Sequence, residues 1–277
     1  MEQRKLEEKT LHDQLRGDLK TDSYYTSNKK FYTITQSNRE FVKNWLLERS
    51  KGKRVLDYCC GDGNFAIWLA ENGAMAYGID ISPVSIENAT NKAITRGLGH
   101  QARFLVGDAE ATSFSDDFFD FAVVNGALHH LNLERAYSEL ARILKPDGIV
   151  ICTEALRHNP LFHLYRKVTP HLRTAWETEH ILGKKEIEGA RKYFSKVEVL
   201  QFFHLATLGA VPFRRFSGFH FLRRCLEAVD SVLLKLPGLK WWAWMAVFVL
   251  AEPKKAAGIL KSDLEYKEVK SDVKAVA

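Results

Sequence analysis

Residues 55–64 decide the fold, and they read Val55-Leu56-Asp57-Tyr58-Cys59-Cys60-Gly61-Asp62-Gly63-Asn64. An apolar run ends in a carboxylate, and two glycines follow in the turn before a helical pattern. Glycine lets the backbone approach a ligand closely, and open α/β sheets bind ligands where their strands end. A pyrophosphate-binding turn needs G-x-G-x-x-G, whereas this turn has two glycines and two added carboxylates. The turn therefore favours a ligand that carries an ammonium and a sulfonium.

Around this turn, short β-rich runs alternate with helical patterns, which predicts βαβ units and a parallel sheet. Two later strands are predicted after the alternation stops. The predicted strands are Arg54–Tyr58, Met75–Asp80, Arg103–Val106, Phe121–Asn125, Ile149–Thr153, Lys196–His204 and Ala243–Glu252. The predicted helices are Phe31–Arg49, Gly63–Asn72, Val84–Arg96, Leu133–Leu144 and Lys184–Tyr193, with Ser82 as an N-cap before Pro83.

Acidic residues follow the first three predicted strands. Asp80 comes 23 residues after Asp57, at a strand end where an acid can accept both ribose hydroxyls of a nucleoside. Asp108 follows the third strand, where a carboxylate can accept from an exocyclic adenine amine. We therefore expect the three acids to share one ligand.

Five motifs along residues 54–154 are similar to those of class I S-adenosylmethionine-dependent methyltransferases of the broad type 11 kind. Cys59 departs from the family pattern, which usually has glycine at that position. The matching segments are Leu56–Gly63 for L-D-x-G-C-G-x-G, Gly78–Ser82 with its acid Asp80, Asp108 after the third strand, Phe119–His130, and Leu144–Gly148.

The resemblance implies an α/β fold with a doubly wound, seven-stranded, mostly parallel sheet and helices on both faces. The strand order would be 3-2-1-4-5-7-6, with the last strand antiparallel. Residues 1–50 would form an N-terminal helical lid, residues 51–252 the methyltransferase domain, and residues 253–277 a flexible tail. Within the domain, residues 155–195 would form a substrate cap and residues 205–242 a helical insertion between strands six and seven.

The resemblance also implies an enzyme that uses S-adenosyl-L-methionine to methylate a small, lipophilic or anionic acceptor at oxygen, nitrogen or carbon. Two alternatives stay open, a cofactor-binding scaffold without turnover and a nicotinamide-dependent oxidoreductase. The expected cofactor-binding residues are Asp57, Cys59, Gly61, Gly63, Asp80, Ile81, Asp108, Ala109 and Asn125.

Residues after the fifth strand are expected over the mouth where an acceptor must sit. Histidine titrates near neutrality and can deprotonate a hydroxyl, so His130, His158 and His180 are candidate general bases. A salt-bridged cap without catalytic groups is the alternative. We expect no metal site, because His129 and His130 lack a partner at ligand spacing. Candidate substrate residues are Tyr24, Tyr25, Glu154, Arg157 and Arg173, and Arg166 of the same segment could also hold an anionic acceptor.

Charge is unevenly distributed along the chain. The net charge is +6, but residues 1–154 hold 19 Lys and Arg against 22 Asp and Glu, whereas residues 155–277 hold 21 against 12. Such an asymmetry suggests an anionic partner for the C-terminal part. The basic, amphipathic residues 205–242 either lie on an anionic membrane or, as we prefer, pack on the sheet or on the second subunit of a homodimer. No nucleic-acid-binding module is recognisable.

The four cysteines have no C-x-x-C spacing and read as reduced thiols in a cytoplasmic protein. The charged N-terminus is not expected to be a signal peptide, and no apolar run reaches the ~20 residues that a membrane span requires. We therefore expect a cytoplasmic protein that could associate with a membrane only peripherally.

Overall fold

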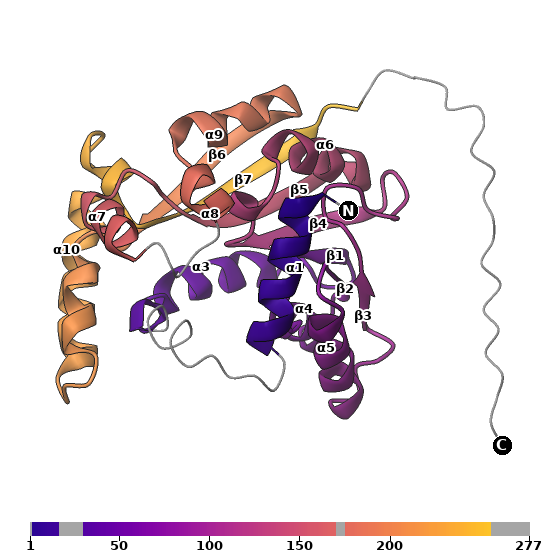
Figure 1. Ribbon diagram of the computed structural model, residues 1–277, viewed down its shortest axis with the longest axis horizontal. Helices are drawn as coiled ribbons and strands as arrows, with labels where there is room; N and C mark the ends of the chain where they lie inside the picture. The colour runs from indigo at the N-terminus through magenta and orange to yellow at the C-terminus, as the bar shows by residue number, and fades with distance from the viewer. Residues whose placement is uncertain (1, 17–29, 170–174, 256–277) are drawn as a thin grey trace.

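The computed structural model describes residues 2–16, 30–169 and 175–255 and contains one seven-stranded sheet in the order β3-β2-β1-β4-β5-β7-β6 (Figure 1). Strand β7 runs antiparallel to both β5 and β6, and the other pairings are parallel. The predicted fold class and strand order are confirmed. The strands are β1 (Arg54–Tyr58), β2 (Met75–Asp80), β3 (Ala102–Val106), β4 (Phe119–Asn125), β5 (Leu144–Ala155), β6 (Phe194–Phe203) and β7 (Met245–Pro253).

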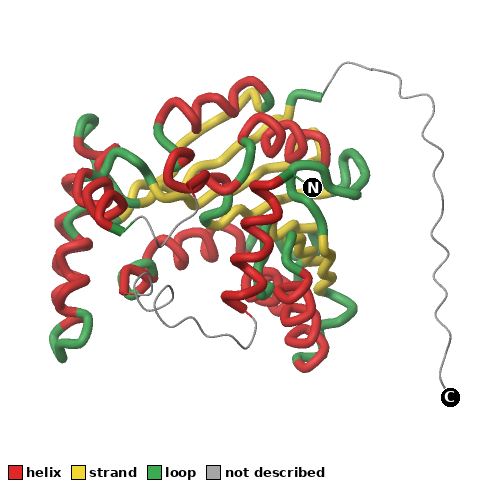
Figure 2. Tube along the Cα trace, in the orientation of Figure 1, coloured by secondary structure: helices red, strands yellow, loops and turns green. Residues whose placement is uncertain are grey.

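Helices cover both faces of the sheet, as the tube drawing in Figure 2 shows. Neighbouring residues of a strand point to opposite faces, so Val55 packs into one core and Leu56 into the other. Helices α3 (Gln36–Leu47), α4 (Asn64–Glu71) and α5 (Pro83–Thr95) cover the face of Val55. Helices α6 (Leu133–Ile143) and α9 (Lys184–Gly189), with the short helix η3 (Ala190–Lys192), cover the other.

Side-chain caps set the start of two sheet-flanking helices. The Ser82 hydroxyl accepts a hydrogen bond from the Ser85 amide at 3.1 Å, and Pro83 takes the first helical position, as predicted. The Asn132 side chain accepts from the Arg135 amide at 3.1 Å in the same way. Both caps lie at the edge of the sheet where the parallel strands end, so they also shape the loops there.

The connection between β6 and β7 contains η4 (Thr207–Phe213) and α10 (Phe219–Leu233). A third apolar cluster joins these two helices to α7 (Pro160–Val168), which lies between β5 and β6 in the chain. Arg223 and Asp230 of α10 are both buried, although they are charged and lie off its apolar stripe. Asp230 accepts from the amides of Ala206 at 2.6 Å and Thr207 at 3.1 Å, so it ties α10 to the start of η4. The remaining helices are α1 (Gln3–Arg16), η1 (Leu128–His130), α8 (Ala175–His180) and η5 (Leu239–Trp242).

Within the described ranges, no helix combines the length and the apolar character needed to cross a bilayer.

Candidate functional site

The turn between β1 and α4 places a buried carboxylate against the first turn of the helix. Asp57 is only 3% exposed, and its Oδ2 accepts from the Ala66 amide at 3.1 Å. Gly63 has a left-handed backbone with φ of 69°, and a Cβ there would lie 2.5 Å from the Phe104 ring. This position therefore requires glycine, because helix α4 approaches β3 too closely for a side chain.

Cys59 adopts the same left-handed region, with φ of 60°. A side chain in this region costs of order 1–2 kcal/mol. The structure therefore explains why glycine suits this position and shows that the cysteine keeps the backbone conformation at an energetic cost. The neighbouring Gly61, with φ of 52°, continues the left-handed turn.

Asp80, at the end of β2, holds the same turn from the other side. Its Oδ2 accepts from the Gly61 amide at 2.8 Å, and its Oδ1 accepts from the Ser82 amide at 3.0 Å. Among the described residues, no Lys, Arg or His lies within ion-pairing distance of Asp57 or Asp80. Burial, with a smaller contribution from the nearby Asp80 charge, raises the pKa of Asp57 to about 7. The site thus concentrates negative charge that no cation of the described protein balances.

Helix α1 crosses the ends of β2 and β3 and packs beside α5 (Figure 1). The Lys5 ammonium donates to Asp108 Oδ2 at 2.7 Å and also lies 2.9 Å from Glu110. At the other end of α1, the Ser82 hydroxyl donates to Asp13 Oδ1 at 2.5 Å. The residue predicted to contact adenine, Asp108, is therefore engaged by the N-terminal helix, which covers this part of the sheet edge.

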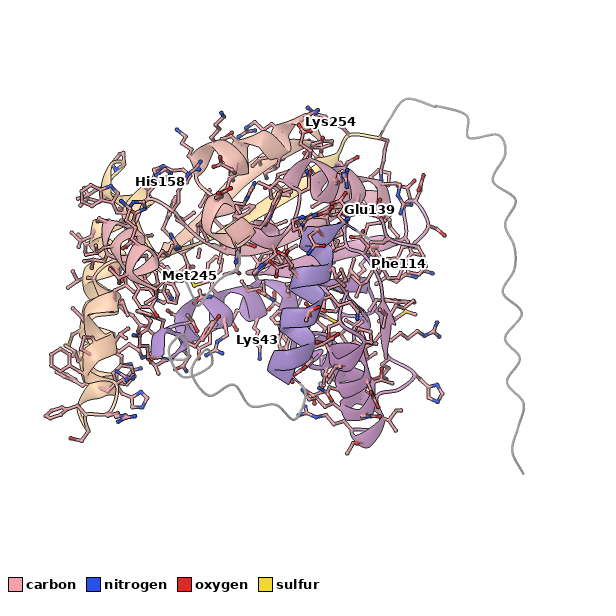
Figure 3. All side chains as sticks on the ribbon, in the orientation of Figure 1. Lys43, Phe114, Glu139, His158, Met245 and Lys254 are labelled. Atoms are coloured by element: carbon pink, nitrogen blue, oxygen red, sulfur yellow. The ribbon has the colours of Figure 1, made fainter. Side chains whose placement is uncertain are left out.

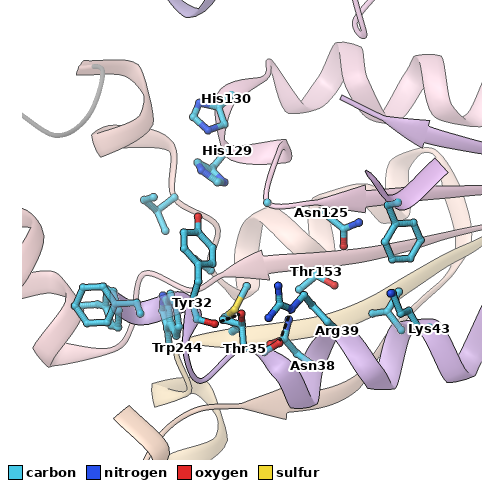
Figure 4. A pocket seen from close by; sticks show the side chains of 18 of the residues that line it. Tyr32, Thr35, Asn38, Arg39, Lys43, Asn125, His129, His130, Thr153 and Trp244 are labelled. Atoms are coloured by element: carbon cyan, nitrogen blue, oxygen red, sulfur yellow. Dashed lines mark hydrogen bonds between the residues drawn. The ribbon is translucent and has the colours of Figure 1, made fainter. Parts of the chain in front are cut away.

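A cavity of about 390 Å³ lies next to this turn, beyond the ends of β4 and β5. Phe65 of α4 and Asn125 of β4 line it, so the cavity adjoins the turn that holds Asp57. Figure 4 shows Arg39 and Lys43 extending from α3 toward the strand ends that carry Asn125 and Thr153. Aromatic walls come from three segments, namely Phe31 and Tyr32 before α3, Phe162 of α7, and Trp244 before β7.

His129 lines this cavity, and the buried carboxylate of Glu154 contacts one of its ring nitrogens. Glu154 is fully buried, and its Oε1 accepts from the amides of Ala127 at 2.8 Å and Leu128 at 2.7 Å. Its Oε2 lies 2.8 Å from His129 Nδ1. A carboxylate oxygen accepts, so Nδ1 carries the proton and Nε2 is left with a lone pair. This pairing orients the His129 ring and leaves Nε2 as the nitrogen that Glu154 does not engage.

The structure brings some predicted site residues together and separates others. His130 and Asn125 line the cavity, and Glu154 lies buried beneath it. His158 is exposed, and Figure 3 shows it apart from Lys43 and Met245, which line the cavity. Neither His158 nor His180 is among the lining residues.

The other predicted residues have the following surroundings. Arg157 pairs with Glu186, and His180 stacks on Trp176 with ring centroids 3.6 Å apart. Ile81 is half-buried, and the buried Ala109 accepts from the Tyr58 hydroxyl. Tyr24, Tyr25 and Arg173 lie outside the described residues.

Sequence reasoning missed two of the basic residues of the cavity, Arg39 and Lys43, and the contact between His129 and Glu154. Arg39 and Lys43 are four residues apart in a helix whose apolar face was recognised, so their common direction was available from the spacing. Arg166 was considered as a residue that could hold an anionic acceptor, and it lines the cavity, although helix α7, which carries it, was not predicted. The contact between His129 and Glu154 joins residues 25 positions apart, and only the pairing of β4 with β5 brings them together.

Comparison with known proteins identifies the central part of the chain. Residues 56–152 match a family model described as "Methyltransferase domain". The chain is 34% identical over 108 residues to demethylmenaquinone methyltransferase of Geobacillus kaustophilus, which covers 38% of this chain and 46% of that protein. It is 38% identical over 127 residues to sterol 24-C-methyltransferase ERG6A of Gibberella zeae, covering 45% of this chain and 33% of that protein.

The matches therefore span less than half the length of these two relatives. Among solved structures, geranyl diphosphate C-methyltransferase of Streptomyces coelicolor, in complex with Mg²⁺, geranyl-S-thiolodiphosphate and S-adenosyl-L-homocysteine, superposes with a TM-score of 0.54. Its identity is 14%, over 79% of this chain and 76% of that chain, so this likeness shows the fold alone.

The family match excludes the nicotinamide-dependent oxidoreductase as the class of this domain. The strand order, the motifs at the sheet edge and the family match agree, and residues 56–152 of the chain form a methyltransferase domain within a sheet of the class I methyltransferase order.

Proposed function

We propose that the chain transfers a methyl group from S-adenosylmethionine to a small, largely apolar acceptor that carries a negative charge or an ionisable hydroxyl. The observation that carries the proposal is the position of the 390 Å³ cavity beside the Asp57 turn. Its lining residue Phe65 precedes Ala66, which donates to Asp57, and its lining residue Asn125 ends the strand that pairs with β1. An acceptor in this cavity and a cofactor in the turn would be neighbours.

The turn fits the cofactor by its chemistry. Asp57 and Asp80 are buried carboxylates without a cation partner among the residues described, and a buried charge is costly unless it is paired. S-adenosylmethionine has an ammonium, a sulfonium and ribose hydroxyls, which are the groups that carboxylates attract. Asp57 and Asp80 would hold it, with Gly61 and Gly63 allowing close approach. When bound there, the cofactor supplies an electrophilic methyl group.

The cavity lining defines the class of acceptor. Its aromatic residues favour a flat or branched apolar molecule. Arg39, Lys43 and Arg166 also line it, and no Asp or Glu is among its described lining residues. Cationic side chains in the lining favour an acceptor with an anionic or acidic group. The relatives named above are named for demethylmenaquinone and for a sterol, which are apolar ring systems.

His129 takes the acceptor proton in this proposal. Its Nε2 is the free nitrogen, because Glu154 holds Nδ1 at 2.8 Å. Removal of the proton makes an acceptor oxygen a better nucleophile, and a positioned base contributes about 10²–10⁴-fold to such a step. The protein otherwise orients the acceptor and excludes water from it.

The experiment is transfer from methyl-labelled S-adenosylmethionine to apolar phenols, hydroquinones and sterols, each with and without an ionisable hydroxyl. We expect labelling of acidic apolar acceptors, with a rate about 10²-fold lower in His129→Gln. His100→Gln is the matched control, since His100 is exposed and outside the cavity lining. Affinity for S-adenosylhomocysteine should be equal in all three proteins. An unchanged rate in His129→Gln would remove the proposed base.

Binding of S-adenosylhomocysteine without any methyl transfer across the panel would instead favour the scaffold alternative.

A further inference from the structure

We infer that one end of the molecule, formed by α7, residues 213–217, α10 and residues 235–242, is a docking surface for an anionic lipid bilayer. We call it the basic apolar end. It lies at the left of Figure 1, where α7 and α10 are adjacent. The inference goes beyond the proposed methyl transfer and is testable without turnover.

Exposed apolar side chains concentrate at this end. Of the seventeen large apolar side chains that are exposed among the described residues, ten belong to these segments. Phe216 is 71% exposed and Phe221 75%, more than any other large apolar side chain described. A soluble protein rarely exposes a contiguous apolar patch of this kind unless the patch binds a partner or a membrane.

The exposed face of α10 differs from the face that packs. Leu222 and Leu226 pack with η4 in the third apolar cluster, together with Phe219. Phe221, Val229 and Val232 share another arc of the helix and are exposed. The apolar arc of α10 is thus wider than its protein contact requires, as in helices that lie in a membrane interface. The preferred expectation, a stripe wholly packed on protein, accounts for only half of this arc.

Helix α7 repeats this arrangement. Leu161, Leu164 and Val168 recur at helical spacing and are all at least 60% exposed. Phe162 points the other way and stacks on Trp244 with ring centroids 4.7 Å apart. Both helices therefore present apolar residues outward from a common packed centre.

Positive charge predominates at this end of the molecule. Residues 160–168 and 207–242 contain eight Lys and Arg but only two acids, Glu227 and Asp230. Asp230 is buried on backbone amides, and Glu227 pairs with Arg223 at 2.7 Å. The following four cations are exposed and have no carboxylate within ion-pairing distance in the described residues: Lys167, Arg215, Arg224 and Lys235.

This charge pattern favours an anionic bilayer over a second copy of the chain as the partner of this surface. A second copy of the chain would bring the same cations against one another in a two-fold interface, and like charges facing one another are unfavourable. An anionic bilayer offers both an apolar interior and negative headgroups, so it complements both components of the surface. Two consecutive arginines are also flanked by phenylalanines in Phe213-Arg214-Arg215-Phe216, a combination suited to the headgroup region.

The surface is continuous with the acceptor cavity. A second cavity, of about 300 Å³, lies between α7 and η4 and is lined by Leu161, Tyr165 and Arg214 of the basic apolar end. It shares Phe31 and Phe162 with the first cavity. An apolar acceptor dissolved in the bilayer would thus have a short path to the site; this consequence alone rests on the proposed function.

The test is sedimentation of the full chain with vesicles of phosphatidylcholine, alone or with about 30 mol% phosphatidylglycerol. The wild type should bind the anionic vesicles, and added salt should weaken the binding. Arg215→Glu/Arg224→Glu should lower the partition coefficient at least ~25-fold, at about fivefold for each lost cation. Phe216→Ser/Phe221→Ser should lower the partition coefficient at least tenfold, since each substitution removes most of the apolar side-chain area that would be buried in the bilayer.

Two matched controls separate this surface from general effects. Ile94→Ser removes a side chain that is 63% exposed on α5, and Lys184→Glu/Lys185→Glu reverses two exposed charges on α9. Both should bind like the wild type. Absence of binding to anionic vesicles, or equal losses in the controls, overturns the inference. A dimer that Phe216→Ser/Phe221→Ser dissociates, without vesicle binding, overturns it in favour of a second copy.

S-adenosylhomocysteine affinity, measured on the same proteins, should be unchanged, so failure of this inference is distinguishable from failure of the proposed function.

Discussion

Replacing Asp57 by Asn should make the protein more stable at alkaline pH while weakening its hold on a cationic cofactor. The asparagine Oδ1 can still accept from the Ala66 amide, which Asp57 does at 3.1 Å. The variant thus keeps the shape and the hydrogen bond of the turn and removes only the buried charge.

The magnitude follows from the pKa of this carboxyl, which burial raises from 3.8 to about 7. Because the folded state holds this proton more tightly than the unfolded state, stability falls as pH rises from about 4 to about 7. Over the whole window the cost of ionising the buried group is about 4 kcal/mol, and between about pH 5 and pH 8 it is about 3 kcal/mol. Asp57→Asn lacks this cost.

The assay is urea unfolding of both proteins at about pH 5 and pH 8. From pH 5 to pH 8, the free energy of unfolding of Asp57→Asn should rise by about 3 kcal/mol relative to that of the wild type. Affinity of the wild type for S-adenosylmethionine should rise through pH 7, because the ionised carboxylate attracts the cation, whereas the variant should show no such rise. A stability difference that is equal at both pH values would refute the buried, uncompensated charge.

Three other substitutions test particular features of the structure. His204 is buried with its pKa lowered to about 3 by burial, with a smaller effect of Arg223, so the unfolded state takes up its proton first as pH falls below about 6.5. Between pH 6.5 and pH 5, the free energy of unfolding of His204→Asn should therefore fall by about 2 kcal/mol less than that of the wild type. Equal falls in urea unfolding would contradict this. Cys59→Gly should leave the melting temperature unchanged or raise it, whereas Cys59→Val should lower it, because a β-branched residue does not fit φ of 60°; the reverse order in a thermal melt would argue against the left-handed turn. Lys5→Met should speed tryptic cleavage within α1, since Lys5 anchors it to Asp108 at 2.7 Å, and a cleavage rate equal to the wild type would show that this pair does not hold the helix.

The sequence was sufficient for the sheet because local patterns and motifs coincided there. Strands β1 and β2 have the predicted bounds, and Ser82 is the cap that its position before Pro83 suggested. These features depend on residues close together in the chain, and the motif resemblance supplied the strand order. The turn residues Asp57 and Asp80 likewise lie where strand ends must meet.

The acceptor side could not be predicted to the same extent, because it is assembled from distant segments. Arg39 comes from α3, Arg166 from α7 and His129 from the loop after β4, and no local sequence pattern indicates that these residues line one cavity. Asp230 shows the same limit, since its acidic character suggested a solvent-facing position. Its burial follows from the amides of Ala206 and Thr207, which the fold of η4 directs at it.

The central claim, that the sheet edge at Asp57 and Asp80 binds S-adenosylmethionine, is tested most directly by calorimetry with S-adenosylhomocysteine. The wild type should bind one molecule per chain. Asp80→Ala should bind at least tenfold more weakly, while Asp147→Ala, which changes an exposed residue near the start of β5, should bind like the wild type. Unchanged affinity in Asp80→Ala, or no binding to the wild type, would contradict the account.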